Sequence, residues 1–145
     1  MEHKDVEHET LGTLRYDGDL EWYEGKVEHG GKVVPVYLAA VGQKEFDAAA
    51  VRAVNVTSRL DEYERRAKEY AAEQLLKIKN DGWLEDGEAP INADEFKEKM
   101  SLQEIVFRRY GAVDFHHGDG NLFWGHDVVV SLDGGDNFVE AKVSG

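Results

Sequence analysis

The sequence predicts an α+β fold with a mainly antiparallel sheet. Three observations predict it: strand-like segments at the N-terminus, helical segments in the middle, and further strand-like segments at the C-terminus. Strands and helices that are segregated along a chain, rather than alternating, are typical of this class. We expect three N-terminal strands and a C-terminal four-strand meander, packed against one long and two short helices. Residues 1–145 are expected to form a single domain.

The N-terminal part is expected to contribute strands at residues 10–16, 21–28 and 32–39, separated by glycine-containing turns. The pair Gly30-Gly31 predicts a tight hairpin between the second and third strands, because glycine accepts the positive φ angles of such turns. Pro35 has no N–H group, so the third strand is predicted to lie at a sheet edge or to be bulged at this residue.

The middle of the chain is predicted to be helical. The apolar residues of a first helix are Phe46, Ala50, Val51 and Val54. A longer helix is expected to begin after an N-cap at Ser58 and to end at residues 80–82. Its apolar stripe, which should face the sheet, consists of Leu60, Tyr63, Ala67, Tyr70, Ala71, Gln74, Leu75 and Ile78. Asn92 and Glu95 have the pattern of a capping box, which predicts a short helix over residues 93–100.

The C-terminal part is predicted to form a meander with strands at residues 102–110, 112–116, 121–132 and 138–143. Glycine-rich turns separate these strands. The last turn, residues 133–137, carries side-chain oxygens of the kind that calcium prefers, but it lacks the spacing and the final glutamate of an EF-hand loop. We therefore interpret it as a turn without a bound ion.

The chain is strongly acidic, with a formal net charge of −13 from 17 basic and 30 acidic residues. The acidic excess lies in residues 1–29 and 81–145, whereas residues 30–80 are nearly neutral. An acidic surface repels phosphate backbones and anionic lipid heads, so neither nucleic acid nor a membrane is expected as a partner. The same surface favours a basic protein partner or a cation.

Several classes of protein are disfavoured by what the sequence lacks. The chain contains no cysteine, which excludes disulfides, cysteine-ligated zinc and thiol catalysis. No apolar run approaches the length of a membrane span, and the charged first residues lack the apolar segment of a signal peptide. We therefore expect a cytoplasmic location. The glycines form neither a phosphate-binding loop nor a dinucleotide fingerprint, and no serine nucleophile elbow is present.

Motifs spread along the chain share the pattern of one bacterial family. They are Leu11-Gly12-Thr13-Leu14, Trp22-Tyr23-Glu24-Gly25, the helix end with Leu76, Asn80, Asp81, Trp83 and Leu84, the hairpin with Gly118, Asp119 and Leu122-Phe123-Trp124-Gly125-His126, and Gly145. The chain thereby resembles the family called domain of unknown function 2262. Asp127 and Val128 depart from the serine and isoleucine that often follow this histidine. The resemblance implies a single domain and no particular activity.

The candidate functional residues lie in one predicted hairpin within residues 115–130. They are His116, His117, Asp119, Trp124, His126 and Asp127. Imidazole and carboxylate groups suit zinc, manganese or non-haem iron, and His116, His126 and Asp119 are the candidate metal ligands. A turn at residues 118–120 would bring His116 and His126 close together. No other cofactor is expected.

The alternative for His126 is a structural role. The alternation of side chains along a strand places it on one face with Leu122, Trp124, Val128 and Val130. A histidine among such apolar neighbours is expected to be buried and hydrogen-bonded.

The large aromatic side chains of the strands also allow two interpretations. They are Trp22, Tyr23, Phe123 and Trp124. Such residues pack sheet cores, but tryptophan and tyrosine are also favoured as exposed anchors for a protein partner. The first functional hypothesis is accordingly a non-enzymatic binding protein, such as an immunity-type inhibitor of a basic target. The second is a metal-binding protein or metal-dependent enzyme centred on the hairpin from His116 to Asp127.

Overall fold

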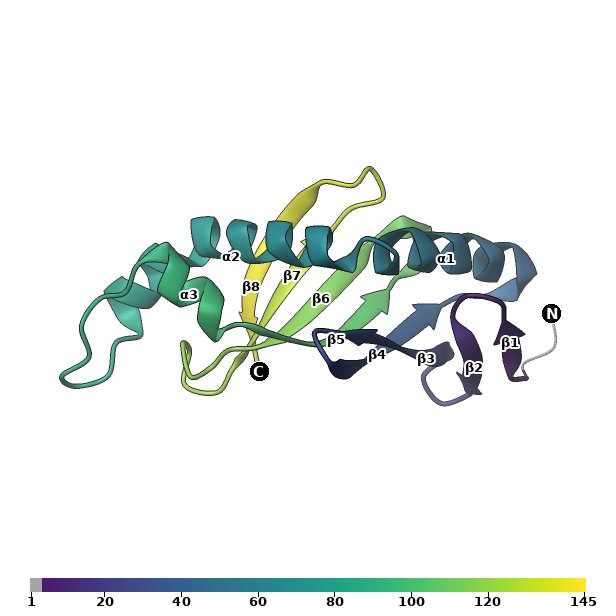
Figure 1. The fold of residues 1–145 in the computed structure, drawn as a ribbon, viewed down its shortest axis with the longest axis horizontal. Helices are drawn as coiled ribbons and strands as arrows, with labels where there is room; N and C mark the ends of the chain where they lie inside the picture. Colours follow the sequence, from purple (N-terminus) through teal and green to yellow (C-terminus); the bar gives the residue numbers. More distant parts are fainter. Residues whose placement is uncertain (1–3) are drawn as a thin grey trace.

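The computed structural model describes residues 4–145 and contains one eight-stranded sheet with three α-helices (Figure 1). The strands are β1 (Val6–His8), β2 (Gly12–Asp17), β3 (Trp22–His29), β4 (Lys32–Ala39), β5 (Ser101–Phe107), β6 (Val113–Gly118), β7 (Asp127–Leu132) and β8 (Phe138–Ser144). The helices are α1 (Gly42–Thr57), α2 (Leu60–Gly82) and α3 (Ala93–Lys99), and a 3₁₀ turn, η1 (Arg109–Gly111), follows β5.

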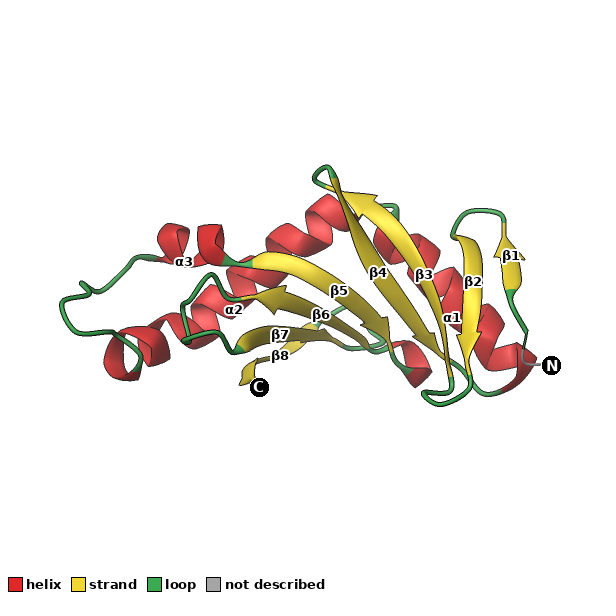
Figure 2. Cartoon of the chain, turned by 90° about the horizontal axis from the view of Figure 1, so that it is seen from below, coloured by secondary structure: helices red, strands yellow, loops and turns green. Residues whose placement is uncertain are grey.

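The strands lie in the sheet in the same order as in the sequence. Neighbouring strands pair antiparallel, except that β4 and β5 pair parallel through Val36–Ile105, Tyr37–Val106 and Leu38–Phe107. The helices form the crossover between β4 and β5 and cover one face of the sheet, so the strands lie in front of them in the view from below (Figure 2). This architecture confirms the predicted α+β class.

Two predictions for the N-terminal strands turn out differently. A short strand, β1, precedes the first predicted strand and pairs with β2. The strand that contains Pro35 is not at an edge and pairs with β3 without a bulge. Pro35 is tolerated because pairing with β5 begins only at Val36, so the missing N–H group lies outside that ladder. The predicted hairpin is confirmed, with positive φ angles of 59° at Gly30 and 79° at Gly31.

Helix α1 is longer than predicted, and its buried face differs from the predicted one at Val51. It runs for 16 residues, so the fold has two long helices and one short helix. Its buried residues are Phe46, Ala50, Ala53 and Val56. Val54 is half-buried against the core, but Val51 is 62% exposed, because the buried positions follow Phe46 at steps of four, three and three residues and Val51 lies off this line.

Helix α2 confirms most of the predicted stripe. Leu60, Tyr63, Ala67, Ala71 and Leu75 are buried, but Gln74 and Ile78 are exposed. The expected N-cap is wrong: Arg59 occupies that position, and the Ser58 hydroxyl instead donates to the Asn55 carbonyl of the preceding helix. The capping box of α3, formed by Asn92 and Glu95, is confirmed.

The apolar core lies between the helices and the covered face of the sheet, in two clusters. The first joins α1 and the start of α2 to the strands from β2 to β6 and to Leu132 at the end of β7. The second joins the rest of α2 and α3 to β7 and the β6–β7 loop. Phe138 packs against both clusters. No helix within residues 4–145 is long and apolar enough to cross a membrane.

Candidate functional site

The loop between β6 and β7 is wound around one buried carboxylate. Asp119 is 6% exposed, and its two carboxylate oxygens accept backbone N–H groups from Asn121 (3.0 Å), Phe123 (2.8 Å) and Gly125 (3.0 Å). A carboxylate that satisfies three donors fixes the backbone around it. This corrects the predicted strand at residues 121–132, which begins only at Asp127.

Four residues of this loop have left-handed backbone conformations. Their φ angles are 54° at Gly120, 69° at Asn121, 58° at Trp124 and 93° at Gly125. At Gly120 a Cβ atom would also collide with the carbonyl oxygen of Lys99, so only glycine fits there. Such conformations are costly for bulky residues such as Trp124 and persist only where the surrounding contacts enforce them.

The loop conformation breaks the alternation expected of a strand and turns one tryptophan outward. The consecutive residues Leu122 and Phe123 are both fully buried, whereas Trp124 is 52% exposed. The indole Nε1 of Trp124 donates to the carbonyl oxygen of Trp83 over 3.2 Å. Of the two interpretations of the large aromatic residues, core packing therefore holds for Phe123, whereas Trp124 is exposed.

Three aromatic rings meet at this end of the molecule. The ring of Trp83, which directly follows α2, lies 4.8 Å from that of Trp124 and 5.8 Å from that of His126, measured between centroids. Both pairs are steeply inclined, at 60° and 76°. We call Trp83, Trp124 and His126 the aromatic corner. His126 is half-buried, less buried than the predicted structural role requires.

The loop between α2 and α3, residues 83–92, is hydrogen-bonded to the β6–β7 loop, and we call it the acidic loop. The Asn121 side-chain amide donates to Glu85 over 3.2 Å. The buried ammonium group of Lys79 donates to the Trp83 carbonyl (2.6 Å) and to Glu88 (3.1 Å). The backbone N–H of Glu85, and then Lys79, lower the pKa of Glu88 below its ordinary value. The loop thus places carboxylates next to the aromatic corner.

The family model described as an uncharacterized protein conserved in bacteria, DUF2262, matches residues 8–143. The chain belongs to the DUF2262 family. No curated protein and no solved structure matches it. In this DUF2262 chain, two of the segments on which the sequence resemblance rests meet at the aromatic corner: the end of α2 with Trp83, and the loop from Asp119 to His126.

The register of the hairpin separates the predicted metal candidates. His116 pairs with Val129 and His117 with Val128, so His116 is not opposite His126 as a turn at residues 118–120 would have placed it. The carboxylate of Asp119 is occupied by backbone donors. Within residues 4–145, no three histidine, aspartate or glutamate side chains are grouped as a metal site would require. Metal binding at the hairpin stays a prediction.

The structure places His117 in a contact that the sequence did not indicate. His117 is fully buried on the covered face, and its Nε2 is bonded to the carboxylate of Glu64 on α2, which is 5% exposed. Its Nδ1 donates to the carbonyl of Phe115 over 3.1 Å. The Glu64–Lys68 ion pair (3.8 Å) lies on the solvent side. The only sequence signal was the position of Glu64, directly after Tyr63 on the buried stripe.

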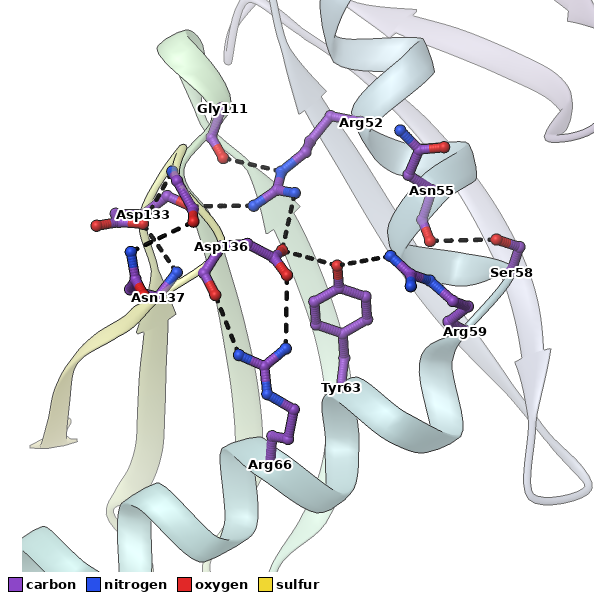
Figure 3. Close-up of polar contacts among 11 residues, drawn as sticks. Arg52, Asn55, Ser58, Arg59, Tyr63, Arg66, Gly111, Asp133, Asp136 and Asn137 are labelled. Atoms are coloured by element: carbon purple, nitrogen blue, oxygen red, sulfur yellow. Dashed lines mark hydrogen bonds and ion pairs between the residues drawn. The ribbon is translucent and has the colours of Figure 1, made fainter.

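The turn between β7 and β8 is also built from internal hydrogen bonds. Asp133 accepts the N–H groups of Gly135 and Asn137, both over 2.9 Å, which confirms the interpretation of residues 133–137 as a turn. The guanidinium group of Arg52 on α1 donates to two other oxygens of the turn, the carboxylate of Asp136 and the carbonyl oxygen of Asp133 (Figure 3).

Asp136 connects this turn to both long helices. Its carboxylate lies 3.1 Å from Nη1 of Arg52, 3.5 Å from Nη1 of Arg66 and 2.7 Å from the hydroxyl of Tyr63 (Figure 3). Burial raises the pKa of Asp136, but the hydrogen bonds from Tyr63 and Arg52 and the two arginine charges outweigh it, so the pKa is lowered overall. Burial and the bond to Asp136 raise the pKa of Tyr63. This network holds the β7–β8 turn against α1 and α2.

The face of the sheet that no helix covers carries the other large aromatic pair. Trp22 stacks on Tyr37 with 4.4 Å between ring centroids, and Tyr23, its neighbour, is buried on the opposite face. Trp22 and Tyr37 are half-buried, so they form part of the uncovered face and are less exposed than Trp124.

Proposed function

We propose that the protein is a non-enzymatic binding module whose aromatic corner docks a positively charged segment of a protein partner. The observation that supports this proposal is the exposure of Trp124 on a backbone held in a left-handed conformation. A loop in which hydrogen bonds and backbone strain turn a tryptophan outward, while the two residues before it are buried, is better explained by recognition than by folding.

The chemistry of the aromatic corner suits a cation. Indole faces attract guanidinium and ammonium groups, and tryptophan is favoured at binding hot spots. The surrounding residues 81–99 contain seven acidic residues, Asp81, Glu85, Asp86, Glu88, Asp94, Glu95 and Glu98, against the two basic residues Lys97 and Lys99. Lysine or arginine side chains are therefore the complementary groups of a partner.

An acidic, immunity-type inhibitor of a basic enzyme such as a nuclease is one form that this proposal takes. Charge complementarity would speed the encounter of such partners and would disfavour binding to nucleic acid. This form of the proposal rests on the net charge of −13 and on the acidic surroundings of the aromatic corner. A cytoplasmic location remains part of the proposal.

The test uses an oligoarginine peptide as the probe. Titration of the full chain, followed by tryptophan fluorescence and calorimetry, should show binding that weakens steeply as ionic strength rises from ~0.01 M to ~0.15 M, over which the screening length falls from about 30 Å to about 8 Å. Trp124→Ala should weaken binding about tenfold, the factor for ~1.4 kcal/mol. An oligoglutamate peptide and duplex DNA should not bind at either salt concentration.

The matched control is Leu20→Ala, because Leu20 is an apolar residue of similar exposure, 58%, and lies in the β2–β3 turn, far from Trp124 in the sequence. It should bind the peptide like the wild type. Equal binding by Trp124→Ala, or tight binding of DNA, would overturn the proposal. A rise in melting temperature with added zinc or manganese, seen in the wild type and absent in His126→Ala, would instead support the metal-binding alternative.

A further inference from the structure

A second feature lies at the opposite end of the parallel strand pair, away from the aromatic corner. A hollow of about 390 Å³ opens between the first half of α1 and the segment that follows β5. It sits where β4 and β5 end, and ligands in open α/β sheets bind preferentially at the carboxyl ends of parallel strands. Its volume is within the range of small-molecule sites, about 300–1,000 Å³.

Short side chains leave the hollow open, and rigid contacts hold its wall in place. Ala39, Ala48 and Ala49 face it, and buried Phe107 forms part of its base. Arg52 fixes the far wall by donating to the carbonyl of Gly111 over 3.1 Å. The hollow is therefore formed before any ligand arrives.

A close contact between two loops supports the same wall. A Cβ atom on Gly134 would lie 2.9 Å from the carbonyl oxygen of Tyr110, so the β7–β8 turn packs directly against η1. Tyr110 has a φ angle of 66° and is 85% exposed. As in the loop that carries Trp124, the surrounding contacts hold a bulky residue in a left-handed conformation and turn an aromatic ring outward.

The rim of the hollow is basic although the chain is acidic. Lys44, Arg52, Arg108 and Arg109 line it, with Glu45 as the one acidic residue. Three of these cations have their own carboxylates: Arg109 is bidentate to Glu45 (2.7 and 2.8 Å), Arg108 pairs with Asp114, and Arg52 pairs with Asp136. Within the described residues, Lys44 has no carboxylate partner, which leaves one uncompensated positive charge at the mouth.

We propose that this hollow binds a small organic carboxylate with an apolar body. The apolar body would rest on Ala48, Ala49 and Phe107, and the carboxylate would face Lys44 beside Arg109. A few positioned polar groups around an apolar cavity are the usual composition of small-molecule sites. A cationic ligand would meet the charge of Lys44, and a neutral one would leave that charge without a partner.

A larger hollow, of about 630 Å³, carries no such argument. It lies over β2, β3 and β4, and most of its lining residues are exposed, among them Arg15, Glu24 and Lys26. Its charges are of both signs, and it is a depression of the surface rather than a built cavity.

The test compares two probes of matched shape, 4-phenylbutyrate and the neutral 4-phenylbutan-1-ol, by amide NMR titration of the full chain. We expect phenylbutyrate to shift the amide signals of Lys44, Ala48, Ala49 and Gly111. The alcohol should bind about tenfold more weakly, the factor for ~1.4 kcal/mol. Shifts confined to the aromatic corner, no shift at millimolar probe, or equal binding of both probes would overturn the proposal.

Two variants locate the site. Ala48→Leu fills the hollow from an exposed helix position, where a larger side chain leaves the core intact, and it should abolish the shifts. Lys44→Gln should weaken phenylbutyrate about tenfold and leave the alcohol unchanged. Lys32→Gln, which removes an exposed lysine in the β3–β4 hairpin, is the matched control. Equal losses with Lys32→Gln and Lys44→Gln would show a general charge effect and contradict the site.

Discussion

At the scale of single residues, Asp119 shows how one carboxylate decides the position of another side chain. Its three bonds to backbone N–H groups draw the chain inward at Leu122 and Phe123 and thereby force Trp124 outward. Asp119 was a candidate metal ligand in the sequence, but in the structure its oxygens are used by the loop itself. A residue type that suits metal binding is equally suited to fastening a turn.

We expect Asp119→Ala to lower the free energy of unfolding by ~1–3 kcal/mol, because it leaves backbone donors without a partner. The emission maximum of Trp124 should also shift, since the loop loses its fixed conformation. Asp127→Ala, at an exposed position where β7 begins, is the control and should change stability by less than ~0.5 kcal/mol. Urea unfolding followed by fluorescence measures both quantities, and equal stability losses in the two variants would contradict the role of Asp119.

At the scale of elements, helix α2 is fixed to the sheet by a polar contact as well as by its apolar stripe. Glu64 and His117 meet in the core between α2 and β6, although 53 residues separate them in the sequence. The carbonyl of Phe115 can only accept, so Nδ1 of His117 donates to it, while Nε2 of the same ring is bonded to the Glu64 carboxylate.

Glu64→Ala should destabilise the fold by ~3–5 kcal/mol, because it leaves His117 buried without its partner. The matched control is Glu69→Ala on the same helix, which removes a surface pair with Arg65 (3.0 Å) and should cost less than ~1 kcal/mol. The double variant Glu64→Leu/His117→Leu should recover much of the loss. Thermal and urea unfolding provide the comparison. A cost at Glu64 no larger than at Glu69 would show that the pair contributes little.

The sequence predicted those elements whose cause is local. The Gly30-Gly31 hairpin and the capping box of Asn92 and Glu95 depend on residues within a few positions of one another, and both are confirmed. The Glu64–His117 contact depends on tertiary packing, which no local pattern reveals. For the same reason the period-two alternation expected at Leu122 and Trp124 failed: a carboxylate outside the assumed strand determines the backbone there.

The hollow beside α1 could not have been predicted from the sequence either. No sequence pattern marks its alanines, and its rim combines side chains from α1, the end of β5 and η1. At the aromatic corner, the sequence indicated Trp124 and His126 as candidates, but the contact of Trp83 with them required the three-dimensional arrangement.

At the scale of the whole molecule, ion pairs join different elements of the fold. Asp136 ties the β7–β8 turn to α1 and α2, Glu45 ties α1 to Arg109 after β5, and Glu88 ties the acidic loop to the end of α2. All three carboxyl groups have lowered pKa values. For Glu45 the main cause is the hydrogen bond from Arg109.

The lowered pKa values predict how stability depends on pH. A carboxyl group whose pKa is lower in the folded than in the unfolded chain contributes stability above the unfolded value of ~4, and the contribution is lost as pH falls through the folded value. The contribution of these carboxyl groups to the free energy of unfolding should therefore be nearly constant from pH ~7 to pH ~5 and should decrease below pH ~4. Urea unfolding at a series of pH values measures this.

Asp136→Asn should be less stable than the wild type near neutral pH and lose less stability on acidification. Asp86→Asn, in the exposed part of the acidic loop, should leave the acid-dependent loss unchanged. If Asp136→Asn lost as much stability as the wild type between pH ~5 and ~2, the ion pairs of Asp136 would not be a source of acid sensitivity.

The strand order leaves β1 and β8 as the two open margins of the sheet (Figure 1). An unpaired edge strand can pair with a strand of another chain, and here each edge strand has a feature that disfavours this. Strand β1 has only three residues, and β8 exposes the charged side chains of Glu140 and Lys142. Partners that add a strand to an existing sheet need a long, uncharged edge strand to pair with. Both edges thus disfavour self-association through backbone pairing, and the partner binding that we propose would use side chains.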